Sequence, residues 1–423
     1  MTDCVCNAVA GSRSGVGPDV EPTTPAWMAV FSLAMGVFGL LTAEYLPASL
    51  LTPMATDLGV SEALAGQAVT VTAVVALFAG LLVPGLTRGI DRRWVLLGFS
   101  TLMIASNLLV AVSSSLAVLL LMRILLGIAL GGFWSMAAAV AMRLVPAALL
   151  PRALSIIFSG IAIGTVVAVP LGSYLGGLYG WRSAFFAAAA VGVVTLAFQS
   201  FTLPRLAPRR PARLRTVFEV LRRPGIAMGM FACVLVHSGH FAMFTYVRPF
   251  LEGTTGIDAQ GLSLMLLGFG VANFAGTLLA GWLLERHPLA TLVLMPALVG
   301  VAALALVLLP ASVPGQAVLL AIWGLAFGGV PVAWSNWVAS AVPDQAESAG
   351  GMVVASVQSA IATGAAAGGA MFSLGGSAGV FVAAAVLMLL AALLIALRVR
   401  VRSVHGSAQA TTAPLIANPS QRQ

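Results

Sequence analysis

The sequence predicts an all-α integral membrane protein with twelve transmembrane helices. Its composition, the length of its apolar segments and its arginine distribution all support this. Of the 423 residues, 60% are hydrophobic and only 8% are charged, whereas a soluble domain carries about 25% charged residues. Apolar segments of about 20 residues, long enough to cross a hydrocarbon core of about 30 Å, recur from Trp27 to Leu397. A soluble protein is therefore excluded.

The apolar segments fall into two groups of six, separated by one long polar interruption. We predict helices near residues 27–51, 62–86, 94–113, 116–142, 153–177, 183–203, 225–250, 259–284, 289–309, 315–341, 348–373 and 376–397. The corresponding regions are a disordered tail (1–26), an N-terminal six-helix half (27–203), an arginine-rich linker (204–224), a C-terminal six-helix half (225–397) and a second tail (398–423).

The basic residues predict how the helices are oriented. All 21 are arginine, and they cluster in alternate connections, most densely in the linker 204–224. Loops rich in basic residues stay in the cytoplasm, so we expect the linker and both termini on the cytoplasmic side of a bacterial inner membrane. The net charge of +8 therefore reflects membrane orientation, and we predict no nucleic-acid partner.

An internal repeat links the two groups of helices. The sequence Gly127-Ile-Ala-Leu-Gly131-Gly132 returns as Gly324-Leu-Ala-Phe-Gly328-Gly329, in the fourth helix of each half. The two copies are 197 residues apart (324 − 127), and the same separation aligns Arg88 with Glu285 in the corresponding loops. Two halves repeated in parallel orientation build transporters whose substrate site lies between them, near the middle of the membrane.

Local motifs resemble those of the major facilitator superfamily, in its twelve-helix drug:proton antiporter branch. The branch has an arginine followed four residues later by glycine in helix 4, and Arg123-Ile-Leu-Leu-Gly127 matches it. Its loop 2–3 motif is altered here, because Arg88 stands where the motif has aspartate; Asp91 is the candidate replacement. The resemblance implies gating roles for Arg88, Asp91, Arg92, Glu285 and Arg286.

Longer phrases are similar to bacterial purine ribonucleoside exporters of that branch. They include Glu44-Tyr-Leu-Pro47, Gly131-Gly-Phe-Trp134 and Thr245-Tyr246-Val-Arg248. The resemblance implies proton-coupled efflux of purine ribonucleosides such as inosine, adenosine and guanosine, by a monomer without a cofactor. The alternative is an exporter of drugs or sugars from the same branch.

Glu44 and Arg123 are the carboxylate and the guanidinium that lie well inside predicted helices. Both lie roughly 10 Å below the outer surface, at 1.5 Å per residue. A lone charge there costs at least about 2.5–3.5 kcal/mol, so we predict that the two side chains pair. The functional hypothesis is a proton-coupling site, and the alternative is a static ion pair joining helices 1 and 4.

Polar and aromatic residues in apolar helices are candidates for substrate binding, since ligand pockets combine apolar walls with a few hydrogen-bonding groups. They are Trp134, His240, Phe244, Tyr246, Trp334, Asn336 and Gln358. His237, His240 and Cys233 have a spacing that also suits a metal, but we favour a cavity-lining role for His240 and predict no metal site. Each candidate taken alone is more often a packing residue.

Helix 5 carries a small residue at every fourth position, with a proline set into the stripe. These residues are Gly160, Gly164, Gly172 and Gly176, with Pro170. Small stripes let helix backbones approach closely, so we predict tight packing. The resemblance adds the hypothesis that this face slides as the halves move.

Two other functional classes find little support. The sequence lacks the metalloprotease and hydrolase motifs, which argues against an enzyme, and it lacks a soluble domain for a sensor. Cys4 and Cys6 form a Cys-x-Cys pair in the N-terminal tail, but no partner ligands lie nearby, so we predict that they bind no metal.

Overall fold

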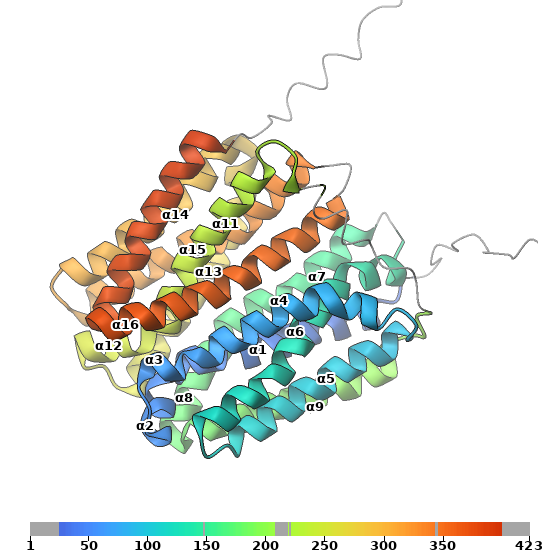
Figure 1. Cartoon of the computed structure of the whole chain (residues 1–423), viewed down its shortest axis with the longest axis horizontal. Helices are drawn as coiled ribbons and strands as arrows, with labels where there is room; N and C mark the ends of the chain where they lie inside the picture. Colours follow the sequence, from blue (N-terminus) through green and yellow to red (C-terminus); the bar gives the residue numbers. More distant parts are fainter. Residues whose placement is uncertain (1–24, 147–148, 208–218, 220, 343–345, 400–423) are drawn as a thin grey trace, which may run out of the picture.

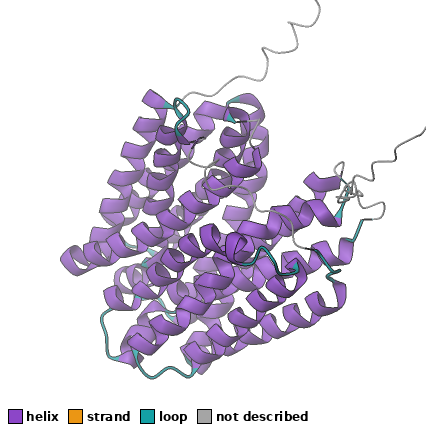
Figure 2. Ribbon diagram, turned by 45° about the vertical axis from the view of Figure 1, so that its right-hand side comes forward, coloured by secondary structure: helices purple, strands orange, loops and turns teal. Residues whose placement is uncertain are grey.

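A computed structural model of the chain describes residues 25–146, 149–207, 219, 221–342 and 346–399. Figure 2 shows helices joined by short loops throughout this part of the chain, without strands. The predicted tails and most of the linker lie outside the described residues. Their disorder and boundaries therefore stay predictions.

The first half contains six membrane crossings, some of which consist of more than one helical piece. Its elements are α1 (Trp27–Ser49), α2 (Leu51–Leu58), α3 (Glu62–Ala65), α4 (Gln67–Leu86), α5 (Arg92–Ala111), α6 (Leu116–Leu144), α7 (Leu150–Ile163), the π-helical turn η2 (Gly164–Ala168), α8 (Val169–Tyr179) and α9 (Trp181–Thr202). The pieces α7, η2 and α8 form one continuous apolar crossing.

The second half repeats this plan. Its elements are α11 (Ile226–Thr245), α12 (Val247–Thr255), α13 (Ala259–Arg286), α14 (Pro288–Leu308), α15 (Val313–Ala341) and α16 (Ala346–Arg398). The described residues contain 11 helices long and apolar enough to cross a membrane. The last of them, α16, turns at Gly375 and Gly376, where the φ of Gly376 is +63°, a region that favours glycine. Its two arms give twelve crossings, which confirms the predicted fold class.

Two predicted helices are broken near one end, and proline explains both breaks. The segment predicted at 27–51 ends at Ser49, and the segment predicted at 225–250 divides at Tyr246 into α11 and α12. A proline lacks the N–H that would bond the carbonyl four residues earlier, and its ring clashes with that carbonyl. Pro53 therefore releases the carbonyl of Ser49, and Pro249 releases that of Thr245.

Among the described residues, the two halves share a hydrophobic core toward one end, which we call the closed end. It is the end that carries α2, α3 and α12, which Figure 1 shows gathered at the lower left. There Ala48, Leu51, Ala65 and Val69 of the first half pack into the core of the second half. The first half has its own core around α1, α6 and α7, built from first-half residues alone. We call the opposite end, which carries the loop 87–91, the arginine-rich end.

The small residues of helix 5 lie against α1 and the residue that follows it. A Cβ added at Gly160 would lie 2.6 Å from the carbonyl oxygen of Ala34, and one at Gly176 would lie 2.2 Å from Leu50 Cδ2. Gly164 and Gly172 face the same helix. The π-helical turn η2 precedes Pro170 and lies against Gly270 of α13, so this stripe touches both α1 and the other half. Its sliding stays a prediction.

Candidate functional site

Arg123 is fully enclosed and joins three helices. Its guanidinium lies on α6, donates from Nη1 to the carbonyl of Ala43 on α1 at 2.8 Å, and donates from Nε to the Thr72 hydroxyl on α4 at 2.9 Å. The carbonyl of Ala43 is free because Pro47, four residues later, has no N–H to donate to it. A kink-forming proline therefore creates the acceptor that holds the buried arginine.

The predicted ion pair between Glu44 and Arg123 is wrong. Arg123 reaches the backbone carbonyl of Glu44 at 3.5 Å, while Oε1 of the Glu44 carboxyl has no hydrogen-bond partner. The carbonyls of α1 and the Thr72 hydroxyl satisfy the guanidinium, so it does not need the carboxylate. The two groups still interact electrostatically through the interior, which is a looser relation than the contact that we predicted.

Glu44 instead faces the other half of the molecule. Its side chain is 3% exposed and interacts with the side-chain amide of Gln358, on the first arm of α16. One oxygen of each group, Oε1 in both cases, is enclosed and unpartnered. An unsatisfied buried polar atom costs about 1–3 kcal/mol, and such atoms in native proteins call for an explanation. Two such atoms, one from each half, therefore lie at the boundary between the halves.

His240 lies in an aromatic cage built by the second half. Phe327 lies flat against its imidazole, with ring centroids 3.3 Å apart, and Phe244 stacks at 5.6 Å. The indole Nε1–H of Trp323 donates to Nδ1 of His240 at 3.0 Å. Phe244 in turn contacts Tyr45 of α1 at 5.4 Å between centroids. Two of the predicted substrate residues, His240 and Phe244, therefore meet beside the neighbour of Glu44.

Three other predicted substrate residues lie elsewhere. Trp334 is enclosed and packs edge-to-face on Trp337, Trp134 stacks on Phe158 in the first half, and Asn336 is exposed. No contact among the described residues joins these three to His240 or Glu44. Their role as substrate ligands stays a prediction.

Tyr246 is part of the closed end. Its ring is fully enclosed and its hydroxyl lies 3.5 Å from the carbonyl oxygens of Ala63 in the first half and Ala365 in the second. A Cβ added at Gly66 or Gly369 would lie 2.2 or 2.8 Å from that hydroxyl oxygen. The tyrosine therefore fills a slot that exists because both halves contribute a glycine.

Arg248 makes a second bond across the closed end. It donates from Nη1 to the carbonyl of Ser49 at 2.7 Å and pairs with Glu252 at 2.8 Å. Pro53 releases the Ser49 carbonyl, just as Pro47 releases that of Ala43. In both places an arginine from another helix binds the carbonyl that a proline has freed.

Gly66→Ala is expected to prevent full closure of this end, because the added methyl group would overlap the Tyr246 hydroxyl. Overpacking of this kind costs about 1–3 kcal/mol. We expect faster reaction of a water-soluble maleimide with a cysteine placed at Ala48, which is buried in the shared core. Tyr246→Phe removes the overlapping oxygen, so adding it to Gly66→Ala should slow the reaction again. Unchanged labelling in Gly66→Ala would show that the tyrosine slot does not hold the end closed.

A salt bridge secures the closed end within the first half. Asp57 of α2 accepts hydrogen bonds from Arg182 at 2.5 Å and from the Trp181 indole at 3.2 Å. These two donors hold the pKa of Asp57 below its ordinary value. The bond attaches α2 to the start of α9 and leaves the carboxylate ionised at neutral pH.

At the arginine-rich end, Asp91 binds two backbone N–H groups. Its carboxylate caps α5 by accepting from the backbone N–H of Arg93, and it also accepts from that of Leu206, both at 2.9 Å. Arg92 bonds Thr87 within the loop, whereas Arg88, Glu285 and Arg286 are exposed. These contacts attach the loop to the segment after α9. The gating roles of the five residues stay predictions.

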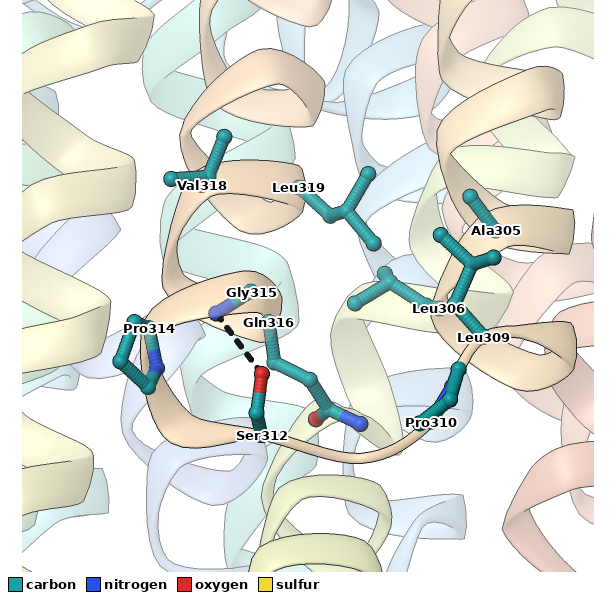
Figure 3. Close-up of a pocket in the computed structure, with 10 residues that line it drawn as sticks. All are labelled: Ala305, Leu306, Leu309, Pro310, Ser312, Pro314, Gly315, Gln316, Val318 and Leu319. Atoms are coloured by element: carbon teal, nitrogen blue, oxygen red, sulfur yellow. Dashed lines mark hydrogen bonds between the residues drawn. The ribbon is translucent and has the colours of Figure 1, made fainter.

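A cavity of about 620 Å³ lies between the end of α14 and the start of α15. Figure 3 shows its wall of apolar side chains, with Ser312 capping Gly315. None of the predicted site residues lines it. The Glu44 and His240 groups lie instead where the two halves meet.

The metal interpretation of His237, His240 and Cys233 has no geometric support. Nδ1 of His237 lies 2.8 Å from the carbonyl oxygen of Cys233, and His240 is bonded to Trp323. Within the part of the chain that the structure describes, no group of three His, Cys, Asp or Glu side chains could hold a metal ion. Cys4 and Cys6 lie outside that part.

Sequence reasoning missed Arg248, Trp323 and the glycines of the tyrosine slot. A signal for Arg248 was present, because Pro53 within an apolar segment implies a free carbonyl at Ser49. Trp323 and Gly66 gave no such signal, since their partners come from elements far away in the chain.

Comparisons with known proteins agree with this architecture. The family model described as Major Facilitator Superfamily matches residues 27–350 and 230–420. Proteins named purine ribonucleoside efflux pump NepI, from Salmonella enteritidis PT4 and Salmonella typhimurium LT2, are each 45% identical over 377 residues, or 89% of this chain and 95% of theirs. A crystal structure of a D-xylose-proton symporter matches with a TM-score of 0.71 and 18% identity, over 89% of this chain and 98% of that chain. This last likeness concerns the fold alone.

Proposed function

The chain belongs to the major facilitator superfamily, and we propose that it exports purine ribonucleosides such as inosine, adenosine and guanosine in exchange for protons. The observation that carries the proton coupling is Glu44, an enclosed carboxyl with an unpartnered oxygen at the boundary between the halves. The substrate class follows the name of relatives that are 45% identical over most of the chain. The family comprises transporters, so the protein is not an enzyme.

The proposal includes an orientation in a bacterial inner membrane. The arginine-rich end faces the cytoplasm, as the distribution of arginine favours, and both termini lie on that side. The closed end then faces the periplasm. In this proposal, nucleoside enters from the cytoplasm in the state with the closed end shut. The transporter acts as a monomer, since the site is built from the two halves of one chain.

The exchange follows from the position of Glu44 behind the closed end. When that end opens, the carboxyl meets periplasmic water and takes up a proton, and the nucleoside leaves. When the closed end forms again, Tyr246 and Arg248 isolate Glu44 from the periplasm. The proton then leaves toward the cytoplasm as the next nucleoside binds. Arg123 provides a fixed positive charge nearby and holds α1 in place during both steps.

Radiolabelled inosine in inverted membrane vesicles tests the proposal. In such vesicles the periplasmic side faces inward, so an acidic interior should drive inosine accumulation, and a protonophore should abolish it. One proton yields about 2.3 kcal/mol per 100 mV, enough for roughly a fiftyfold gradient of a neutral solute. Accumulation of unrelated drugs without any of inosine would overturn the substrate assignment and favour the drug exporter.

A further inference from the structure

The hydrogen bond between Trp323 and His240 fixes where the imidazole carries its proton. An indole N–H can only donate, so Nδ1 of His240, 3.0 Å from Trp323 Nε1, has to be the acceptor. In a neutral imidazole the proton then lies on Nε2. A doubly protonated ring would place an N–H at Nδ1, directly against the indole N–H. Trp323 therefore favours one tautomer and makes Nε2 a hydrogen-bond donor.

The surroundings of His240 leave only that donor available. Phe327 covers a face of the ring, and Phe244 and Phe269 lie nearly parallel to it at 5.6 and 6.4 Å. Nε2 has no partner among the described residues, yet it is absent from the enclosed, unpartnered atoms, which include Nε2 of His237. The N–H of His240 is therefore reachable, whereas that side of His237 is sealed.

The location of this donor suits a ligand that spans the two halves. Phe244, one turn further along α11, contacts Tyr45, the neighbour of Glu44. Oε1 of Glu44 and Oε1 of Gln358 are also unpartnered at this boundary, but both atoms are enclosed in this state, whereas Nε2 of His240 is not. A ligand with a flat ring that accepts a hydrogen bond complements this donor.

We propose that Trp323 positions His240 as a donor and that the Nε2–H group of His240 binds N7 of a purine base. The inference rests on the proposed function and names the atom that is recognised. Adenosine, guanosine and inosine all carry N7 as an acceptor on the outer edge of the base, away from the ribose. Pyrimidine nucleosides lack this atom. One neutral donor can therefore select purines as a class without distinguishing among them.

The test compares adenosine with 7-deazaadenosine, in which a C–H replaces N7. Transport into inverted vesicles of the unmodified protein should show a half-saturation concentration about tenfold lower for adenosine, the equivalent of one hydrogen bond to a donor that is otherwise left unsatisfied. This comparison needs no variant, so it does not depend on the folding of one. Equal values for the two nucleosides would overturn the inference while leaving nucleoside export intact. Transport of neither compound would instead overturn the proposed function.

Three variants then test whether His240 and Trp323 cause the preference for adenosine over 7-deazaadenosine. His240→Asn keeps an acceptor for Trp323 but has no donor at the position of Nε2. It should therefore raise the half-saturation concentration for adenosine to that for 7-deazaadenosine. His240→Gln keeps an N–H near the position of Nε2 and should retain part of the preference. Trp323→Phe keeps an aromatic ring without its N–H, and should weaken the preference more than it lowers the maximal rate. A full tenfold preference in His240→Asn would overturn the inference.

Discussion

Glu44→Gln is expected to abolish uphill, pH-driven export of nucleoside while leaving downhill exchange of substrate partly intact. Glutamine keeps the shape of the side chain and can still bond Gln358, but it cannot take up or release a proton. The coupled step is then lost, and the roughly fiftyfold gradient that one proton supports per 100 mV should fall to about onefold. Binding of nucleoside needs only hydrogen bonds at this position, so exchange of labelled for unlabelled inosine should continue.

The measurement is inosine accumulation in inverted vesicles with and without an acidic interior. Asp258→Asn is the matched control, because Asp258 is an exposed carboxylate that caps α13 by accepting from the backbone N–H of Gly261, an acceptor that asparagine retains. It should leave the gradient-driven accumulation in place. If Glu44→Gln vesicles still concentrated inosine in response to the pH gradient, the proton would have to be carried by another group.

His240 is a poor candidate for that other group. Its Nδ1 accepts from Trp323, so protonation there would break a bond inside an aromatic cage. His237 is disfavoured for a different reason: its Nδ1–H donates to the carbonyl oxygen of Cys233, so a second proton would have to go to Nε2, which is enclosed and has no partner. The contacts of the two histidines thus favour Glu44 as the group that carries the proton.

The helices could be predicted from the sequence because hydropathy acts locally. Each crossing needs about 20 apolar residues, and that requirement is visible in any window of the chain, whatever the rest of the fold does. Pro47 and Pro53 are likewise local features, so the carbonyls that they free can be predicted from the sequence. The arginines that bind these carbonyls cannot. A freed carbonyl is predictable from a proline, whereas the arginine that binds it comes from a helix whose position only the fold decides.

The sequence nominates members of the candidate site, whose roles stay predictions, but it does not give their contacts. Depth along the helix placed Glu44 and Arg123 at the same level, and this led to the prediction of an ion pair. Depth says nothing about which way a side chain points around its helix. The carbonyls of Ala43 and Glu44 hold the guanidinium on one side of α1, and the carboxyl reaches Gln358 on another. Tyr246, in turn, was assigned to the substrate although it fills the closed end, because a tyrosine near a helix terminus suits either role.

Arg123→Ala is expected to lose both transport and stability. The two losses have different causes, so a second substitution can separate them. Without the guanidinium, the carbonyl of Ala43 and the Thr72 hydroxyl lose their buried donor. The Ala43 carbonyl is then unsatisfied, which costs about 1–3 kcal/mol, whereas the Thr72 hydroxyl still donates to the carbonyl of Ala68. Glu44 also loses its nearby positive charge. Arg123→Lys should restore little, because a single ammonium cannot reproduce the forked contacts to α1 and α4.

Pro47→Ala provides the matched suppressor for this prediction. Alanine restores the backbone N–H that can bond the Ala43 carbonyl within α1, so this group no longer needs Arg123. Adding Pro47→Ala to Arg123→Ala should therefore recover part of the loss in thermal unfolding temperature of the purified protein. Transport should stay absent, since the buried charge near Glu44 is still missing. If the double variant unfolded at no higher temperature than Arg123→Ala, the freed carbonyl would not be what the arginine satisfies.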